Sequence, residues 1–374
     1  MSDYYSEFGT KKKKRRSFWL WFLDVVITLL STVVAVAMIL TLIVPYVHPD
    51  HAWYLPVLGL GAPAIYVVNV ICFLFWVVRW RLVRASVMLV LTVLGFFNVS
   101  VVYQPEIRKH YETKYPRRSI KVMTYNVRSF YDDRGQSSVD SVVSLITREK
   151  PQVVCLQEFN KRLANQSEAF AELRKKYKTV YFGRISKRDT TCSVPLCVLS
   201  NFRLLRSGVI ESPKSSVWVD LEWNNDTLRV FNNHLHSTAI NAKDDDFLTN
   251  GLLEDSLREE KVKSMFRRFC DNSVLRASQV DTIAQVIHST KTRHLVMGDF
   301  NDTPVSYVYR EMSQGLEDTF CEMGTGCSHT YRGFFNTLRI DYIFRSAGLA
   351  TLSYEVLDVN FSDHRPIVVR FEKL

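Results

Sequence analysis

The sequence predicts three membrane-spanning helices followed by an α/β (α+β) domain, in which two sheets pack face to face with helices outside them. Two observations lead to this prediction. Long apolar stretches are concentrated in the first 105 residues, although only 47% of the 374 residues are hydrophobic overall. From Ser119 onward, short β-rich runs alternate with helical stretches, and no fixed-period repeat interrupts them.

The first apolar stretch runs from Phe18 to Val44 and carries one charged residue, Asp24, near its start, where the side chain can reach the interface. Two further stretches, Leu55 to Val78 and Ala85 to Tyr103, contain no charged residue. About 20 apolar residues cross the hydrocarbon core of a bilayer. A cleaved signal peptide is the alternative for the first stretch, but its apolar core is too long and two more spans follow. We therefore expect three transmembrane helices within residues 17–103.

The distribution of lysine and arginine predicts the orientation in the membrane, because these residues collect on the cytoplasmic side. Six lie in the run Lys11–Arg16 and three between the second and third spans, whereas the loop 45–54 has none. Five basic residues after the third span oppose this bias. The count of nine basic residues against five favours a cytoplasmic N-terminus (residues 1–16) and a domain of residues 119–374 outside the cytoplasm. Residues 104–118 would form a juxtamembrane linker between the spans and this domain. In a Gram-negative bacterium, that domain would be periplasmic and its anchor would lie in the inner membrane.

The formal net charge of +10 divides equally between residues 1–105 and the remainder, at +5 each. A mildly basic domain suits a phosphate-bearing substrate, but it lacks the dense basic stripe of a dedicated nucleic-acid binder. Six cysteines follow the spans, and an exported domain permits disulfides. Cys192/Cys197 and Cys321/Cys327 are the candidate pairs, and reduced, partly buried thiols are the equally supported alternative.

Eight runs rich in β-branched and aromatic residues are strand candidates, and five stretches are helix candidates. The strands are Ile120–Tyr125, Gln152–Leu156, Val194–Leu199, Val217–Trp223, Leu228–Asn233, His294–Met297, Ile340–Phe344 and Ile367–Arg370. The helices are Val139–Arg148, Arg162–Tyr177, Leu257–Cys270, Gln279–Ser289 and Val305–Ser313.

Six short segments place acids, amides and histidines beside apolar runs, where strand ends form a rigid platform for converging groups. They are Met123–Val127, Val154–Glu158, Asn232–Ser237, Met297–Asn301, Arg339–Ile343 and Ser362–Ile367. Each alone is weak, since Gly298-Asp299-Phe300-Asn301 by itself is typical of a turn. Together they match phosphoester hydrolysis, which needs a hard cation on oxygen ligands, a base for water and cationic donors for phosphoryl oxygens. Neither a Gly-x-Ser-x-Gly elbow nor a Walker loop is present.

In this order the six motifs resemble the endonuclease/exonuclease/phosphatase superfamily, from about Ser119 to the C-terminus. The pattern around His234 is closer to the deoxyribonuclease I-like and neutral sphingomyelinase-like branches. The resemblance implies a four-layered α/β/β/α sandwich with the active site at one end of the two sheets. It also implies a bound Mg²⁺, for which Mn²⁺ can substitute.

The resemblance also implies a role for each motif residue. Asn126, Glu158 and Asp363 are implied to form the metal site, with Asn126 also organising the phosphate. His234 is implied to contact the scissile phosphate or act as an acid. The remaining residues are implied to act on water, on the phosphate and on each other. Asp299 orients or deprotonates the attacking water, Asn301 contacts the phosphate, and Asp341 pairs with His364.

Departures from two branches narrow the interpretation. Apurinic endonucleases carry Gln-Glu-x-Lys, whereas Gln157-Glu158 continues here to Phe159-Asn160, which disfavours DNA repair. The 5-phosphatase signature Trp-Cys-Asp-Arg is absent from residues 337–341. His236 is a further candidate because it would share a strand face with His234. Residues 238–253, with Asp244-Asp245-Asp246, suggest an acidic surface loop or a substrate-selecting lid.

The favoured hypothesis is a membrane-anchored, metal-dependent phosphodiesterase that acts on a lipid head group or on extracytoplasmic nucleic acid. Three spans would hold the active site near the bilayer, which favours lipid. A nonspecific extracytoplasmic nuclease and an inert scaffold using the same fold are the alternatives.

Overall fold

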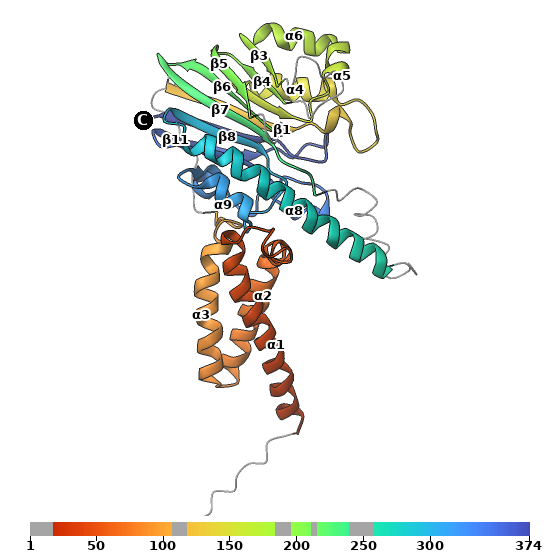
Figure 1. Cartoon of the computed structure of the whole chain (residues 1–374), viewed down its shortest axis with the longest axis vertical. Helices are drawn as coiled ribbons and strands as arrows, with labels where there is room; N and C mark the ends of the chain where they lie inside the picture. The colour runs from red at the N-terminus through yellow and green to blue at the C-terminus, as the bar shows by residue number, and fades with distance from the viewer. Residues whose placement is uncertain (1–17, 107–117, 184–195, 211–214, 239–257) are drawn as a thin grey trace, which may run out of the picture.

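We describe the chain from a computed structural model, over residues 18–106, 118–183, 196–210, 215–238 and 258–374. Helices α1 (Phe18–Ile43), α2 (Leu55–Val78) and α3 (Leu82–Val99) form an elongated bundle beside a larger mixed domain (Figure 1). Each is long and apolar enough to cross a membrane. The three predicted spans are therefore present as helices, although the third begins three residues earlier than expected, includes Arg84 and ends before Tyr103.

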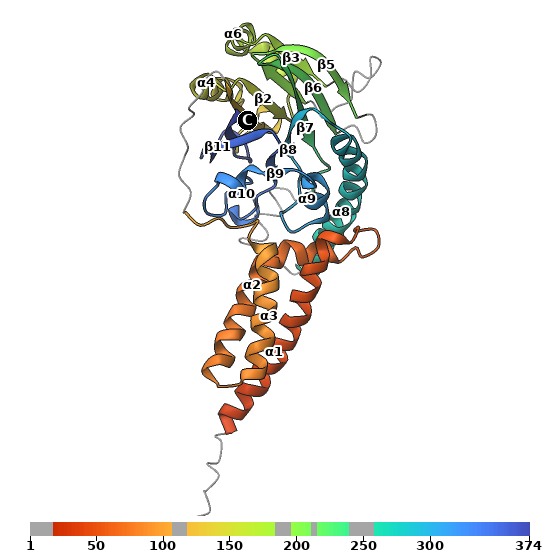
Figure 2. The same ribbon diagram turned by 90° about the vertical axis from the view of Figure 1, so that its left-hand side faces the viewer.

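The bundle neutralises its one internal acid. The Asp24 carboxylate is buried and pairs with Arg79 at 2.9 Å and Arg81 at 3.5 Å, both from the turn between α2 and α3. It is thus held inside the bundle instead of reaching outward as the sequence suggested. A buried carboxylate is tolerated only with such partners. These three residues mark the end of the bundle that lies away from the mixed domain (Figure 2).

Two six-stranded sheets form the centre of the mixed domain. In the first, the order is β11-β12-β1-β2-β4-β3. Its strands are β1 (Ser119–Asn126), β2 (Val153–Gln157), β3 (Thr179–Phe182), β4 (Cys197–Ser200), β11 (Leu349–Val356) and β12 (Ile367–Lys373). In the second, the order is β5-β6-β7-β8-β10-β9. Its strands are β5 (Arg203–Val209), β6 (Ser216–Trp223), β7 (Asp226–His234), β8 (Arg293–Asp299), β9 (Glu317–Asp318) and β10 (Asp341–Arg345).

Helices cover the outer face of each sheet. Those on the first sheet are α4 (Val139–Glu149), α5 (Lys161–Gln166) and α6 (Glu168–Lys176), and those on the second are α8 (Arg258–His288) and α9 (Tyr307–Ser313), with a short α10 (Thr319–Met323) nearby. Aliphatic side chains from both sheets, such as Val122 and Val219, share one buried core, and separate cores lie under the helices. The predicted α/β/β/α sandwich is confirmed.

Local differences from the predicted elements have physical causes. The expected helix Arg162–Tyr177 is two helices, because the Ser167 hydroxyl accepts a hydrogen bond from the Phe170 amide at 3.1 Å and caps a new start. The two helices expected between Leu257 and Ser289 are one continuous α8 in the described residues. The sequence pattern did not indicate β3, β5, β9 and β11.

Several expectations lie outside the described residues, namely the basic run Lys11–Arg16, Cys192 and the acidic segment Asp244–Asp246. Cys321 and Cys327 are both free thiols, so this candidate disulfide is not formed in the structure. Burial raises the pKa of the Cys321 thiol to about 12, which keeps it protonated and unreactive at neutral pH.

The bundle and the mixed domain touch directly. A Cβ at Gly59 of α2 would lie 2.3 Å from the Val305 carbonyl oxygen, so only glycine allows this approach. The Arg339 guanidinium donates to the Val101 carbonyl oxygen at 2.7 Å. Arg310 of α9 lies over the Tyr46 ring, 4.7 Å from its centroid. These contacts place the domain at the end of the bundle where α1 and α3 finish and α2 begins (Figure 2).

Strand register brings three motif residues side by side. In the parallel pair β7–β8, His234 lies opposite Asp299, and in the antiparallel pair β8–β10, Asp341 lies opposite Asp299. The neighbouring Gly298 has φ +135°, and a Cβ there would lie 2.0 Å from the Asn233 carbonyl oxygen. Glycine at this position therefore permits the close approach of β7 to β8 that aligns His234 with Asp299.

We predict that Gly298→Ala lowers the stability of the chain by about 3 kcal/mol or more, because the added methyl group must displace the β7 backbone. Gly315→Ala is the matched control, since Gly315 also has positive φ (+74°) but open space around it. We expect it to cost only about 1 kcal/mol. Thermal unfolding of the detergent-solubilised full chain, followed by circular dichroism, compares them. Equal melting temperatures for the two variants would contradict the packing argument.

Candidate active site

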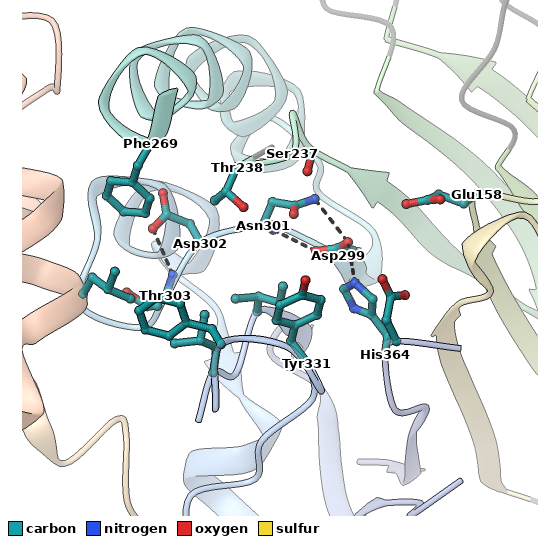
Figure 3. A pocket seen from close by; sticks show the side chains of 15 residues that line it. Glu158, Ser237, Thr238, Phe269, Asp299, Asn301, Asp302, Thr303, Tyr331 and His364 are labelled. Carbon is teal, nitrogen blue, oxygen red and sulfur yellow. Dashed lines mark hydrogen bonds and ion pairs between the residues drawn. The ribbon is translucent and has the colours of Figure 1, made fainter. Parts of the chain in front are cut away.

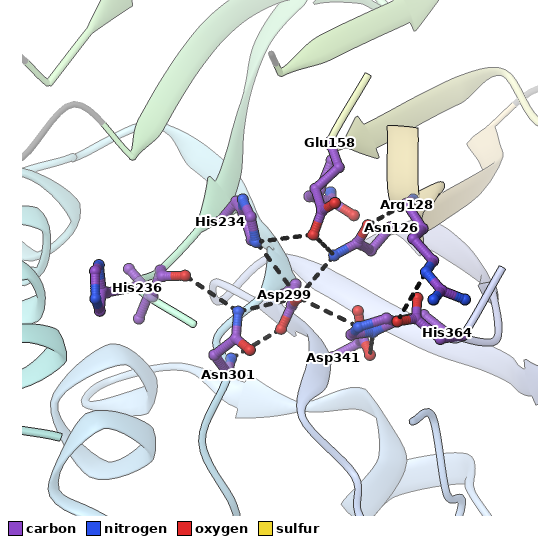
Figure 4. Close-up of polar contacts among 12 residues, drawn as sticks. Asn126, Arg128, Glu158, His234, His236, Asp299, Asn301, Asp341 and His364 are labelled. Carbon is purple, nitrogen blue, oxygen red and sulfur yellow. Dashed lines mark hydrogen bonds and ion pairs between the residues drawn. The ribbon is translucent and has the colours of Figure 1, made fainter. Parts of the chain in front are cut away.

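The motif residues meet at one edge of the sandwich, where both sheets contribute. Asn126 ends β1 and Glu158 follows β2 in the first sheet, and His234 and Asp299 end β7 and β8 in the second. Asp341 begins β10, while Asp363 and His364 precede β12. The side chains of Asn126, Glu158, His234, Asp299 and His364 point toward one another (Figure 4). Segments that are far apart in the sequence therefore form one site.

Asp299 lies at the centre of this site and is fully buried. Its Oδ2 accepts a hydrogen bond from Asn126 Nδ2 at 2.9 Å, which joins the two sheets. Asn301 donates twice, from its backbone amide to Oδ1 at 2.8 Å and from Nδ2 to Oδ2 at 3.1 Å. Two imidazoles also face Oδ2, with His234 Nε2 and His364 Nε2 each at 3.7 Å. Asp299 is thus held in a fixed orientation by donors on several sides.

Burial and the neighbouring groups act in opposite directions on the pKa of Asp299 and on the pKa of His364. Burial raises the pKa of Asp299, while the neighbouring His364 and the Asn126 amide favour its charged form. Burial alone would lower the pKa of His364, but the carboxylates of Asp341 and Asp299 outweigh it and raise that pKa well above its usual range. Asp341 Oδ2 accepts from His364 Nδ1 at 2.9 Å, so the Nε2 edge of the ring is turned toward Asp299.

Glu158 and Asp363 provide the more accessible carboxylates of the site. Glu158 has φ +50°, a left-handed conformation that is costly for a non-glycine residue and turns its side chain inward after β2. Its Oε1 accepts from Asn126 Nδ2 at 3.1 Å and lies 3.6 Å from His234 Nε2. Asp363 Oδ2 lies 3.5 Å from Arg128 Nε. Both carboxylates are about one-third exposed, at 36% and 30%.

A cavity of about 90 Å³ opens between these groups (Figure 3). Its polar wall contains Glu158, Asp299, Asn301, Asp363 and His364. Leu60 of helix α2 lines the same cavity, which therefore borders the transmembrane bundle. The carboxylates predicted to act together do share one pocket.

Two groups of side chains at this site could hold a divalent cation. Asp299, Asp341 and His364 offer ligand atoms within 4.8 Å of one another. His364, however, already bonds Asp341, and its raised pKa favours the protonated ring, which cannot bind a metal. Glu158 and Asp363 are oxygen donors on the open side of the cavity, and this donor set fits Mg²⁺ or Mn²⁺. The sequence predicted Glu158 and Asp363, together with Asn126, as the metal ligands, and this assignment stays a prediction. Asn126 presents its amide nitrogen to Glu158 and Asp299, so in this geometry it aligns the carboxylates.

His236 does not join the site. Strand β7 ends at His234, so the extended backbone that would place both rings on one face stops too early. The exposed His236 ring instead approaches Asn272 Oδ1 of α8 at 3.1 Å, and its backbone amide donates to Gln279. Figure 4 shows it apart from the cluster around Asp299.

Sequence reasoning missed several residues that support the site. The Arg128 backbone amide donates to Asn126 Oδ1 at 3.0 Å, and its side chain faces Asp363. Tyr331 lines the cavity with its ring 5.1 Å from that of His364. Ser362 Oγ donates to the Asn126 carbonyl oxygen at 2.8 Å. Arg128 adjoins a recognised motif and Ser362 is the first residue of another, which was an available signal, whereas no sequence pattern marks Tyr331.

A sequence-family model described as Endonuclease/Exonuclease/phosphatase family matches residues 123–364. A second family model, described as a domain of unknown function (DUF8431), matches residues 24–102. No curated protein matches significantly.

Similar solved structures include an endonuclease/exonuclease/phosphatase from Beutenbergia cavernae DSM 12333, at 16% identity and a TM-score of 0.45, covering 68% of this chain and 72% of that one. A family protein from Leptotrichia buccalis C-1013-b has 16% identity and a TM-score of 0.48, covering 68% and 99%. The catalytic domain of human Nocturnin with bound sulfate has 18% identity and a TM-score of 0.45, covering 69% and 96%.

We predict that Glu158→Gln weakens Mn²⁺ binding at least about tenfold, because it removes a charged oxygen ligand while keeping the side-chain shape. Isothermal titration of the detergent-solubilised full chain measures the affinity. Glu172→Gln, on the exposed face of α6, is the matched control and should bind as the parent does. Unchanged affinity in Glu158→Gln would place the cation elsewhere.

Proposed function

The chain belongs to the endonuclease/exonuclease/phosphatase family, and from this premise we propose that it is a membrane-anchored, metal-dependent phosphodiesterase. Residues 119–374 would form the catalytic domain and residues 17–103 the anchor. The proposal rests on one observation, that four polar side chains converge on the buried Asp299 carboxylate. They are Asn126, Asn301, His234 and His364. Glu158 and Asp363 line the same pocket. An inert scaffold would have no need of this complete and mutually oriented set.

In this proposal Asp299 acts as the general base. Its carboxylate is fixed by Asn126 and Asn301, so it can orient a water molecule and accept the proton as the water attacks phosphorus. Asn301 would also contact the phosphate. Burial favours proton uptake by Asp299, which makes it a stronger base than an exposed aspartate.

The two histidines would act on the phosphate. His364, kept cationic by Asp341, would stabilise the negative charge that develops on the phosphoryl oxygens. His234 lies between Glu158 and Asp299, at 3.6 and 3.7 Å, and its ring nitrogens form no hydrogen bond with the described residues. It would contact the scissile phosphate or protonate the leaving oxygen. Mg²⁺ or Mn²⁺, held by Glu158 and Asp363 next to Asn126, would supply Lewis acidity toward a phosphoryl oxygen when bound.

The proposed orientation places this domain outside the cytoplasm. Arg79, Arg81 and Arg84 lie at the end of the bundle opposite the domain, and arginine collects on the cytoplasmic side. In a bacterial inner membrane, the active site would then face the periplasm, close to the outer surface of the bilayer.

We predict that Asp299→Asn lowers kcat for a water-soluble phosphodiester about 10²–10⁴-fold, because the amide cannot accept the proton. Hydrolysis of bis(p-nitrophenyl) phosphate by the full chain with Mg²⁺, followed by nitrophenolate absorbance, measures this. Asp271→Asn, at an exposed position on α8, is the control and should retain the parental rate. A fully active Asp299→Asn variant would refute the proposed base.

We predict a bell-shaped dependence of rate on pH for the same substrate. The rate should rise as pH increases through the pKa of Asp299, where the base form appears. It should fall when pH exceeds the raised pKa of His364, where the cation is lost. Asp341→Asn removes a carboxylate that raises the His364 pKa, so the alkaline limb should move to lower pH. An alkaline limb that stays in place in this variant would show that His364 does not control it.

A further inference from the structure

A second, larger cavity lies between the transmembrane bundle and the catalytic domain. Its volume is about 580 Å³, within the range of about 300–1,000 Å³ that is typical of ligand pockets. The first turns of α2 form one wall, with Val57, Leu60 and Ala64. Loops of the catalytic domain form the other wall, with Val305 and Leu338. The lining side chains are mostly apolar.

This cavity adjoins the catalytic pocket. Leu60, Thr303, Phe334 and Leu338 line both spaces. Thr303 lies two residues after Asn301, and Leu338 three residues before Asp341, so the shared wall is built from the loops that carry the site. A molecule with its phosphate near Asp299 therefore has only these four side chains between it and the larger cavity.

The cavity also lies at the expected level of the membrane surface. It is lined by the start of α2, a helix that is long and apolar enough to span a bilayer. Trp53 and Tyr54, immediately before α2, are exposed, as aromatic residues at a membrane interface often are. Exposed apolar side chains such as Val67 and Ile71 follow along α2. An apolar chain leaving the bilayer would thus reach the cavity without crossing bulk water.

The charges around the cavity exclude a nucleic-acid strand as its occupant. Arg339 is the one lysine or arginine among the described residues that line it. Its guanidinium is buried and committed to Asp318 at 2.9 Å and to the Val101 carbonyl oxygen at 2.7 Å. A strand of phosphates needs available cations along its path, whereas a hydrocarbon chain needs apolar walls.

We propose that this cavity binds the hydrocarbon chain of a membrane amphiphile whose phosphoester is cleaved in the adjoining catalytic pocket. The inference rests on the proposed hydrolase activity and names its substrate class. It assigns a binding role to the start of α2, so the transmembrane bundle contributes part of the substrate site in addition to anchoring the domain.

Two diesters with the same leaving group test the proposal, hexadecyl p-nitrophenyl phosphate in detergent micelles and water-soluble methyl p-nitrophenyl phosphate at the same detergent concentration. For the full chain with Mg²⁺, we expect kcat/KM to be at least about 100-fold higher for the hexadecyl ester, because only its chain fills the cavity. Equal values would overturn the proposed chain site and leave the hydrolase proposal intact. Hydrolysis of neither ester would instead count against the hydrolase activity itself.

A cavity-filling variant locates the effect. Gly61 lines the cavity, and a Cβ there would meet only Ile65 Cδ1, at 3.7 Å, so Gly61→Leu is chosen to place its side chain at the cavity wall. We expect the ratio of hexadecyl to methyl kcat/KM to fall at least about tenfold. Val67→Leu, on the exposed side of the same helix, is the matched control and should keep the parental ratio. An unchanged ratio in Gly61→Leu would overturn the assignment of this cavity.

A binding measurement on the parental chain depends neither on turnover nor on the correct folding of a variant. Hexadecyl phosphate with a diazirine at the end of its chain, photolysed with the parental full chain, should label partly buried residues of the α2 wall such as Val57 or Leu60. Excess unlabelled hexadecyl phosphate should suppress this labelling. Labelling confined to the exposed, lipid-facing positions of the bundle would contradict the proposal, even if both esters were hydrolysed.

Discussion

The burial of one carboxylate, Asp299, constrains the rest of the site. An isolated buried charge is very costly, so its partners must lie in fixed positions. Those partners come from both sheets, since Asn126 belongs to one and His234 to the other, while Asn301 lies two residues beyond the end of strand β8. A second link, from Gln157 Nε2 to Asn232 Oδ1 at 2.6 Å, joins the sheets deeper in the core. The two links hold the sheets in one relative position, and this position turns the polar groups of the site toward one another.

The contacts between the bundle and the domain fix the position of the pocket relative to the bundle. Gly59 allows α2 to meet the Val305 backbone, and Arg339 joins the segment after α3 to the loop that precedes β10. One contact is a close approach of two backbones, and the other involves a buried guanidinium. A flexible tether would instead make few contacts, and these would be exposed to solvent. In the proposed function, the Gly59 and Arg339 contacts hold the catalytic pocket at a set height above the membrane-spanning helices. A water-soluble relative with the same sandwich would have no equivalent of the Leu60 wall.

Sequence alone predicted the features that depend on local pattern. The three apolar helices, the two-sheet sandwich and the motif residues at strand ends follow from hydrophobic periodicity and from recognisable motifs. Strand β5 was missed because much of it is exposed, and β9 because it has only two residues, so neither gives a clear apolar run. The left-handed backbone at Glu158 and Asn301 is imposed by tertiary packing, since neither residue type requires it. Tyr331 and Leu60 reach the site only through the three-dimensional fold, from segments without a motif. The apolar cavity beside the site likewise has no sequence signature.

The proposed function requires separated polar clusters to form one cation-centred pocket for phosphoester cleavage. The most direct test is an experimental structure of the full chain with Mn²⁺, in which anomalous scattering locates the ion independently of the surrounding atoms. Our account predicts a peak at bonding distance, about 2.0–2.2 Å, from a Glu158 carboxylate oxygen, with Asp363 beside it and Asp299 facing the same space. Mn²⁺ bound away from Glu158, or no peak at a saturating concentration, would contradict the account.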